Sequence, residues 1–379
     1  MSNLQKTKLL VVDDSAFMRK LISDFFSDHR QIEVIGSARN GKDAIKKIEQ
    51  LKPDVVTMDV EMPEMNGMEA LKEIMQKYPL PVIMLSSTTK RGAENTLMAM
   101  EYGAVDFVAK PSGSISLDLH KIKDELVRKV EEASKVTVSK LKKPFRKSTV
   151  AGQAIRHPFN NEESKVKSLL KPTVNIDIPI KKTEWSKTSK KIILIGTSTG
   201  GPRALQEVIT KIPSNVGAPI LIVQHMPAGF TKSLAARLDQ LSEIHVKEAE
   251  QGDLLQKGTA YIAPGGYHLK LRKVGSSFAV VLDNQEPPRA GHRPSVDVMF
   301  EDVSQYSEFD KIAVIMTGMG YDGSKGLVSL KKTGNVMAIA ESAETCIVYG
   351  MPKAAVETQL VDEVADVDDI AQTIMKYMP

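Results

Sequence analysis

The chain has 379 residues, 26% of them charged and 42% hydrophobic, with a formal net charge of +4. This length predicts two domains or slightly more, and the single cysteine, Cys346, excludes a disulfide framework or a zinc site built on cysteines. No apolar run approaches the ~20 residues that cross a bilayer, and the N-terminus lacks the apolar stretch of a signal peptide, so we expect a cytoplasmic protein.

In the first 130 residues, short apolar runs alternate with amphipathic stretches. Strands are expected at 9–12, 34–38, 55–58, 82–85 and 106–108, and helices at 15–26, 42–49, 68–77, 93–101 and 117–133. Five strand–helix pairs in succession predict a doubly wound, five-stranded parallel sheet. Sheets of this kind hold their functional sites at the carboxyl ends of the strands.

Charged and hydroxyl side chains occupy these strand ends. They are Asp13 and Asp14 after the first strand, Asp59 after the third, Ser86 after the fourth and Lys110 after the fifth. Three carboxylates that converge on one crevice repel one another unless a hard cation joins them, and a small set of oxygen ligands suits Mg²⁺. A lysine at the same edge would complement an added anion.

The stretches KLLVVDDS, VVTMDVEMPEMNG, PVIMLSS and DFVAKP resemble those of response-regulator receiver domains. The resemblance implies that Asp59 accepts a phosphoryl group from a histidine kinase. It also implies that Asp14, Asp59 and the backbone carbonyl of Glu61 ligate Mg²⁺, with Asp13 in support.

The same resemblance implies a set of switch residues. Ser86 takes the position of the switch hydroxyl, and Lys110 that of the lysine that contacts the phosphoryl group. Phe107 stands where many receivers carry a switch aromatic residue, often tyrosine. A phenylalanine retains the packing function of this position and lacks the hydroxyl.

Basic residues are concentrated between the two halves of the chain. Residues 139–191 contain 14 Lys and Arg against 4 Asp and Glu, a net charge of +10, which leaves −6 for the remainder. The stretch has no sustained helix or strand period, so we expect a disordered, solvated linker; a docking segment for an acidic partner or a membrane surface is the alternative. The expected organisation is a receiver over 1–130, a basic linker over 131–190 and a catalytic domain over 191–379.

The strand–helix pattern restarts after the linker. Strands are expected at 191–195, 219–223, 312–316 and 336–339, shorter hairpin-type strands at 260–262 and 278–282, and helices at 203–211, 232–241 and 327–332. This order predicts a second doubly wound α/β domain, with a mainly parallel sheet and an antiparallel addition.

A serine lies in a G-x-S-x-G motif directly after the first strand of this domain. Ser198 stands between Gly196 and Gly200, where glycines allow a tight turn that presents the hydroxyl. Amides at the start of the following helix could receive a developing oxyanion. Taken alone, the motif is also compatible with a helix-capping serine or a phosphate-binding loop, although neither nucleotide-binding fingerprint is complete.

A histidine and an aspartate follow two other apolar strands. His225 lies in VQHMP and Asp322 lies in the glycine-rich MTGMGYDG. Each could be structural by itself, but a hydroxyl, an imidazole base and an orienting carboxylate are together the parts of a serine hydrolase. The order Ser198, His225, Asp322 differs from the Ser–Asp–His order of α/β-hydrolases.

The stretches IGTSTGGPRAL, IVQHMPAGFTKSLAARL, HRPSVDVMF, VIMTGMGYDG and IAESAETCIVYGMPKAA closely resemble the catalytic domain of chemotaxis protein-glutamate methylesterases. The resemblance implies that Ser198 is the nucleophile, His225 the base and Asp322 its orienting partner. It places Thr199 and Met319 at the oxyanion and substrate cleft.

The two resemblances together imply a phosphorylation-activated serine hydrolase. Its substrates would be glutamate methyl esters on the cytoplasmic helices of methyl-accepting chemoreceptors, with release of methanol, and receptor glutamines that it deamidates. A chemotaxis histidine kinase would be the phosphodonor, with Mg²⁺ in the receiver and no cofactor for hydrolysis. We expect a monomer that neither binds nucleic acid nor inserts into membranes. The alternatives are a receiver-controlled DNA-binding protein, which only the basic linker supports, and an adaptor with a vestigial triad.

Overall fold

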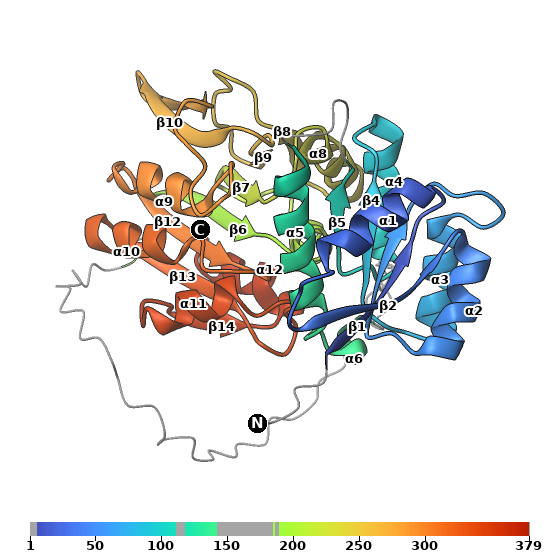
Figure 1. Cartoon of the computed structure of the whole chain (residues 1–379). Coiled ribbons are helices and arrows are strands. Elements are labelled where there is room, and N and C mark those ends of the chain that lie inside the picture. Colours follow the sequence, from blue (N-terminus) through green and yellow to red (C-terminus); the bar gives the residue numbers. More distant parts are fainter. Residues whose placement is uncertain (1–5, 111–117, 142–184, 186–188, 379) are drawn as a thin grey trace, which may run out of the picture.

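The structure, a computed structural model, describes residues 6–110, 118–141, 185 and 189–378. Two α/β domains lie side by side, the first in blue to green and the second in yellow-green to red (Figure 1). Within the described residues, no helix is both long and apolar enough to cross a membrane.

The first domain contains one parallel five-stranded sheet in the order β2-β1-β3-β4-β5. Its strands are β1 (Thr7–Val12), β2 (Ile32–Ala38), β3 (Val55–Asp59), β4 (Val82–Ser86) and β5 (Asp106–Ala109). Its helices are α1 (Ala16–Phe25), α2 (Gly41–Leu51), α3 (Gly67–Lys77), α4 (Lys90–Glu101) and α5 (Asp118–Ala133). The strand order reverses between β1 and β3, and the predicted doubly wound sheet is confirmed.

The local sequence explains where these elements begin. β3 and β4 are buried at every position, as expected for central parallel strands covered by helices on both faces. Polar side chains cap the helices: Asn66 accepts a hydrogen bond from the Glu69 N–H and forms a capping box with the Glu69 carboxylate. Because all five strands are parallel, the polar side chains that follow them lie at the same edge of the sheet.

The second domain contains a parallel seven-stranded sheet in the order β14-β13-β12-β6-β7-β9-β8. Its strands are β6 (Lys190–Thr197), β7 (Ile220–Gln224), β8 (His245–Glu248), β9 (Thr259–Ile262), β12 (Phe309–Ile315), β13 (Val336–Glu341) and β14 (Glu363–Ala365). Its helices are α7 (Gly201–Ile209), α8 (Phe230–Leu241), α9 (Val296–Ser304), α10 (Ser324–Thr333), α11 (Met351–Glu357) and α12 (Val367–Lys376). The antiparallel addition is the hairpin β10 (His268–Val274) and β11 (Ser277–Asp283).

The prediction that residues 260–262 belong to a hairpin is wrong. β9 pairs in parallel with both β7 and β8; of the two strands expected in hairpins, only the one at 278–282, which is β11, lies in a hairpin, with β10 as its partner. A four-residue apolar run is compatible with either arrangement, because its periodicity does not show the direction of its neighbours. α9 was not predicted, because it is buried on nearly every side and so lacks a helical alternation of apolar and polar residues.

Parts of the expected linker are ordered. α5 ends at Ala133, a short helix α6 follows at Val138–Leu141, and the Trp185 indole N–H donates a hydrogen bond to the Tyr377 carbonyl at 3.0 Å. The Trp185 ring meets that of Tyr377 edge to face. The rest of the predicted linker, residues 142–184 and 186–188, lies outside the described residues, so the disordered tether and the domain boundaries stay predictions.

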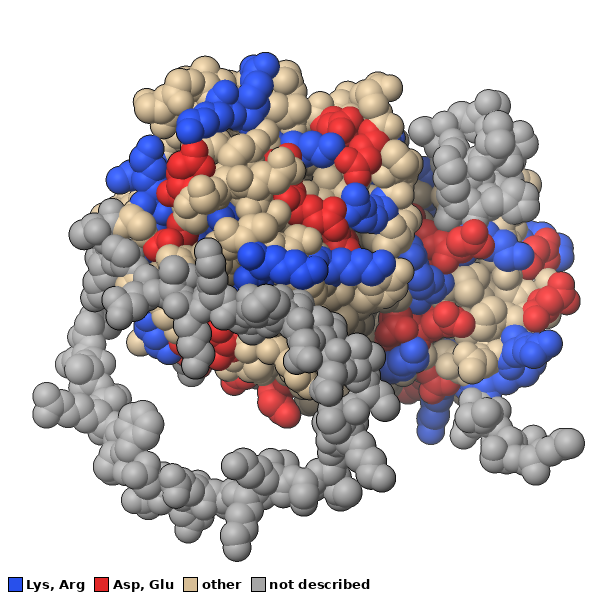
Figure 2. Space-filling model, turned by 90° about the vertical axis from the view of Figure 1, so that its left-hand side faces the viewer, with Lys and Arg blue, Asp and Glu red and all other residues tan. Residues whose placement is uncertain are grey.

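The two domains share an interface built from apolar and polar contacts. Phe107 of β5 stacks on Phe230 of α8 with ring centroids 4.6 Å apart. Arg237 of α8 forms an ion pair at 2.9 Å with Glu101 of α4. On the face shown in Figure 2, the described basic and acidic side chains are interspersed rather than gathered by sign.

Candidate active site and acidic cluster

Ser198 follows β6 at the carboxyl edge of the second sheet. Its N–H donates to the Thr317 carbonyl at 3.0 Å, and the residue is 9% exposed. The turn into α7 requires glycine: Gly200 has φ 78°, and a Cβ at Gly201 would lie 1.9 Å from the Gln224 Oε1. The expected tight turn between strand and helix is therefore present, with the serine at its start.

A buried carboxyl group supports this turn from β13. Glu341 Oε2 accepts the Thr317 N–H at 2.8 Å, and the Thr317 hydroxyl donates to the Thr199 carbonyl at 2.9 Å. Burial raises the pKa of Glu341 to about 7, against the opposing effect of its hydrogen bonds. Sequence reasoning missed Glu341, although it ends an apolar strand as the other site residues do.

His225 follows β7 and contacts Asp322. His225 Nε2 lies 2.8 Å from Asp322 Oδ2. The other ring nitrogen, Nδ1, is buried and has no hydrogen-bond partner within the described residues. Ser198 and His225 line one cavity of about 540 Å³, in which the Ser198 hydroxyl makes no hydrogen bond to any described residue. The unpaired Nδ1 is thus the ring atom left to take a proton.

The Asp322 carboxylate is surrounded by donors. It accepts hydrogen bonds from the Ser295 hydroxyl and from the backbone N–H groups of Val296 and Asp297, at 2.7 to 2.9 Å. Burial acts to raise the pKa of Asp322, but the bond from His225 and the backbone donors outweigh it and lower the pKa to about 2. An ionised Asp322 at neutral pH can fix the orientation and tautomer of His225.

A second histidine lies against the first. The rings of His225 and His292 are nearly parallel, with centroids 3.9 Å apart and 6° between their planes. Burial and the proximity of His225 lower the pKa of His292 to about 3, so its ring is neutral under physiological conditions. His292 was not a candidate in the sequence, because it does not follow a predicted strand.

Both residues that the resemblance placed at the cleft line the cavity. Thr199 and Met319 lie around it with Ser198. The Thr199 hydroxyl is also bonded across the domain interface, to Asp106 Oδ2 at 2.6 Å. Met319 packs against the apolar cluster that α1 and α5 form in the first domain.

The first domain forms one wall of this cavity. Glu125, Arg128 and Lys129 of α5 line it together with Ser198. Lys129 Nζ lies 3.1 Å from Asp106 Oδ1, so Asp106 joins α5 to Thr199. Access to the candidate nucleophile therefore depends on where the first domain lies.

The acidic cluster of the first domain is present as expected. One carboxylate oxygen from each of Asp13, Asp14 and Asp59 lies within 4.8 Å of the others. Lys110 Nζ lies 2.7 Å from Asp59 Oδ2 and 2.9 Å from Asp13 Oδ2. A set of carboxylate oxygens with one exposed member fits a hard divalent cation that keeps part of its water shell.

The other predicted site residues of the first domain are Glu61, Ser86 and Phe107. The Glu61 N–H donates to Asp59 Oδ1 at 3.4 Å. The Ser86 hydroxyl is buried and donates to the Gly92 carbonyl at 3.0 Å, toward α4. Phe107 is buried in the domain interface against Phe230 rather than exposed.

Replacement of Asp59 by asparagine is expected to stabilise the first domain at pH 7.5. Burial, opposed by Lys110 and reinforced by Asp13, raises the pKa of Asp59 from 3.8 to about 6. Between these values the unfolded chain has released a proton that the folded chain retains, so stability falls as the pH rises from 3.8 to 6. Asparagine removes this penalty, which amounts to about 1–3 kcal/mol above pH 6.

Urea unfolding in EDTA at pH 7.5 and pH 3.5 measures this effect. The variant is expected to be more stable at pH 7.5 and similar to the parent at pH 3.5. Asp24→Asn, in an exposed ion pair with Lys20, is the control and should change stability little at either pH. Equal stability of parent and Asp59→Asn at pH 7.5 would contradict the argument.

The fold and these two sites define a class of protein: a receiver domain joined to an α/β domain with the side-chain set of a serine hydrolase. Comparisons with known proteins agree. Residues 9–120 match the response regulator receiver domain family, and residues 193–374 match the CheB methylesterase family. The chain is 54% identical over 375 residues to a protein-glutamate methylesterase/protein-glutamine glutaminase of Geobacillus kaustophilus, covering 99% of both chains.

A second relative carries the same name. It comes from Bacillus subtilis and is 52% identical over 367 residues, which is 97% of both chains. The crystal structure of the Thermotoga maritima CheB methylesterase catalytic domain is 45% identical, with a TM-score of 0.48, and covers 50% of this chain and 99% of that one. The chain belongs to the protein-glutamate methylesterase/protein-glutamine glutaminase family, and the resemblance seen in the sequence is confirmed.

Proposed function

We propose that this protein hydrolyses γ-methyl esters of glutamate on chemoreceptors and deamidates receptor glutamines, under the control of phosphorylation at Asp59. The observation that carries the hydrolase activity is the buried, unpaired Nδ1 of His225 in the cavity that Ser198 lines, with Nε2 bound to Asp322. An adaptor with a vestigial triad is not favoured, because the relatives over the full chain are named as enzymes.

The first chemical step is acylation of Ser198. His225 Nδ1 takes the proton of the hydroxyl as Oγ attacks the ester carbonyl carbon, while Asp322 stabilises the imidazolium. The carbonyl oxygen becomes an oxyanion, and we assign its stabilisation to the backbone N–H of Thr199 in the turn before α7. Collapse of this intermediate breaks the C–O bond, and His225 returns the proton to the departing methanol.

The second step releases glutamate. Water attacks the acyl-enzyme carbonyl and gives its proton to His225, and Ser198 leaves with that proton. With a glutamine side chain, the same sequence breaks a C–N bond and releases ammonia. Met319 and the neutral ring of His292 form apolar and aromatic walls of the cavity around the reacting group.

Methanol and ammonia release test the proposed activity. The full-length protein, supplied with a small-molecule phosphodonor and Mg²⁺, is expected to release methanol from a methylated chemoreceptor cytoplasmic fragment. Release of ammonia from a fragment with glutamine at the same sites tests deamidation separately. A protein that is phosphorylated but releases neither product would contradict the proposal.

The phosphorylation site follows from the acidic cluster. A histidine kinase of the chemotaxis system is the proposed donor, and Asp59 is the proposed acceptor. Mg²⁺ would be held by Asp14, Asp59 and the Glu61 carbonyl, with Asp13 in support, and would offset the charge of the incoming phosphoryl group. Lys110 already contacts Asp59 and can follow the added oxygens, and Ser86 lies at the adjacent strand end.

Removal of Mg²⁺ is expected to abolish phosphorylation of Asp59 and to leave ester hydrolysis by the second domain unchanged. The acidic cluster is confined to the first domain, and no comparable group of ligands occurs among the described residues of the second. A fragment that begins at residue 184 keeps the Trp185 contact with Tyr377. Inhibition of its methanol release by EDTA would contradict the prediction; EDTA inhibition of phosphoryl incorporation into the full chain is the positive control.

A further inference from the structure

Asp322 does not follow its strand directly. β12 ends at Ile315, so a loop of several residues carries Asp322 before α10 begins at Ser324. A loop this long does not fix a carboxylate by itself. The position of Asp322 must therefore depend on contacts from elsewhere in the fold.

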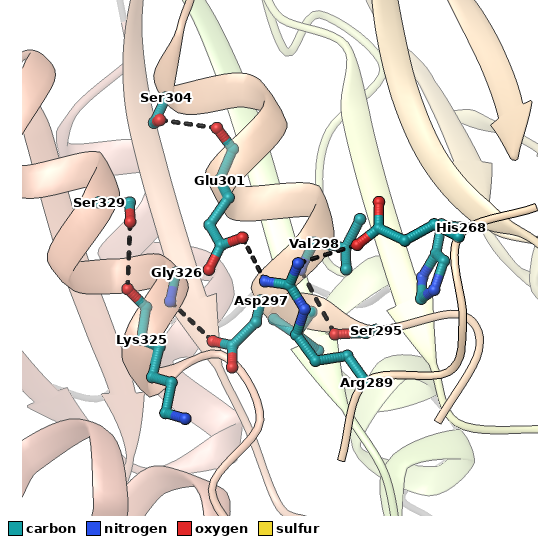
Figure 3. Close-up of polar contacts among 12 residues, drawn as sticks. His268, Arg289, Ser295, Asp297, Val298, Glu301, Ser304, Lys325, Gly326 and Ser329 are labelled. Atoms are coloured by element: carbon teal, nitrogen blue, oxygen red, sulfur yellow. Dashed lines mark hydrogen bonds and ion pairs between the residues drawn. The ribbon is translucent and has the colours of Figure 1, made fainter. Parts of the chain in front are cut away.

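The helices α9 and α10 supply these contacts through their N-terminal ends. Asp322, just before α10, accepts the N–H groups of Val296 and Asp297, the first two residues of α9. In return, Asp297 Oδ1 accepts the N–H of Gly323 at 2.9 Å and that of Gly326 at 2.7 Å. Each helix start is thus capped by a carboxylate from the other, and Figure 3 shows Asp297 reaching from α9 to Gly326.

The N-cap residue of α10 has no side chain that could cap the helix. This residue is Gly323, with φ 96°, and no side-chain hydrogen bond from it closes the first turn. α9 and α10 also approach closely at Gly326. A Cβ at this position would lie 2.6 Å from the Phe300 Cβ and 2.9 Å from the Asp297 Cα. Asp297, which is 1% exposed, therefore takes the place of the missing N-cap side chain.

We propose that Asp297 is a positioning residue for hydrolysis: its carboxylate caps α10 and thereby fixes the loop that presents Asp322 to His225. Without this cap, the first turn of α10 can fray at Gly323, the residue next to Asp322. The Asp322 carboxylate is then free to turn away from His225 Nε2. The inference rests on the proposed hydrolase function and adds a residue that neither touches the cavity nor belongs to the triad.

Asp297 also contributes charge. It faces Asp322 across the helix ends and Glu301 on its own helix, while His225 and His292 lie beyond Asp322. On α10, the Lys325 ammonium lies over the Tyr321 ring, 5.7 Å from its centre. The partial positive charges of the two helix N-termini make a buried negative charge at this place tolerable.

The test compares Asp297→Ala, which removes the acceptor oxygens, with a matched control on the same helix. Asp302→Ala also removes a partly buried carboxylate that accepts a backbone N–H, from Leu271 of β10 at 2.8 Å, but Asp302 does not line the cavity. The phosphorylated full-length proteins are assayed for methanol release from a methylated chemoreceptor fragment. Thermal midpoints are measured alongside.

Asp297→Ala is expected to lower kcat by about tenfold with little change in KM, because Asp297 does not touch the substrate. Asp302→Ala should lose a similar amount of thermal stability and keep its kcat. Asp297→Asn, whose amide oxygen can still accept the N–H groups of Gly323 and Gly326, should recover most of the kcat lost in Asp297→Ala.

Two outcomes would overturn the inference. One is an Asp297→Ala protein that loses only stability, as Asp302→Ala does, with kcat unchanged. The other is loss of the fold in both Asp297 variants, which would make Asp297 a structural residue of the core. The parent protein separates this inference from the proposed function: if the parent releases no methanol, the function fails, whereas an active parent with an equally active Asp297→Ala refutes the positioning role alone.

Discussion

Replacement of Ser198 by alanine is expected to lower methyl-ester hydrolysis by about 10⁴-fold or more and to leave the chain folded. Alanine removes the only atom that forms the acyl intermediate, while the Ser198 N–H keeps its hydrogen bond to Thr317. Methanol release from a methylated chemoreceptor fragment measures the loss. Phosphorylation of Asp59 in the same protein, in the other domain, checks that the chain is intact.

His225 and Asp322 should act as one catalytic unit with Ser198. His225→Ala and Asp322→Asn are each expected to cause a large loss, and Ser198→Ala combined with His225→Ala should lose little more than the worse single variant. Ser329→Ala, at a partly buried serine on α10 that does not line the cavity, is the control and should retain full activity. If the losses of the double variant multiply, the two residues act independently and the assignment of the triad fails.

The strand ends of both sheets could be predicted from the sequence because each central strand is a continuous apolar run. Asp59 and Ser86 are the last residues of the buried strands β3 and β4. Ser198 and His225 directly follow two other strands, β6 and β7. In a parallel sheet the carboxyl ends share one edge, so the chain position of such a residue already indicates its place in space. For these residues, local sequence and global fold give the same answer.

Asp322 shows where this reasoning stops. Its glycine-rich loop follows an apolar strand, which made it a candidate, but the sequence gives no sign that the start of α9, about 25 residues earlier, supplies its hydrogen bonds. α9 itself has apolar residues on nearly all sides and gave no helical period. His292 was missed for the same reason, because its place in the site depends on contacts between distant segments. Glu341 is different, because it ends an apolar strand and the same strand-end reasoning could have found it.

The domain interface was also beyond sequence reasoning in its details. The position of Phe107 indicated a switch residue, and the structure adds that its ring lies on Phe230 of the second domain. Similarly, Asp106 is unremarkable in the chain, yet it bridges Lys129 and the hydroxyl of Thr199, the neighbour of Ser198. Such pairs form where the surfaces of the two domains dock, and contacts of this kind produce no periodic pattern in the sequence of either domain.

Removal of the first domain is expected to raise the basal rate of hydrolysis above that of the unphosphorylated full-length protein. α5 supplies Glu125, Arg128 and Lys129 to one wall of the cavity at Ser198, so the docked first domain restricts entry of a receptor helix. The contacts at Asp106, Phe107 and α4 hold it there. The gain in rate is limited by the difference in free energy between the docked and open states. For coupling of ordinary size, the rate rises about 5–150-fold.

A charge reversal in the full chain supplies the matched control. Arg237→Glu places like charges opposite Glu101 across the interface and should raise the unphosphorylated rate, and Glu101→Arg should do the same. The double variant restores an ion pair of opposite polarity and should return the rate toward that of the parent. A fragment beginning at residue 184 that is no faster than the unphosphorylated full chain would refute occlusion; the first domain would then have to act by recruiting the enzyme to its receptor or by activating it when phosphorylated.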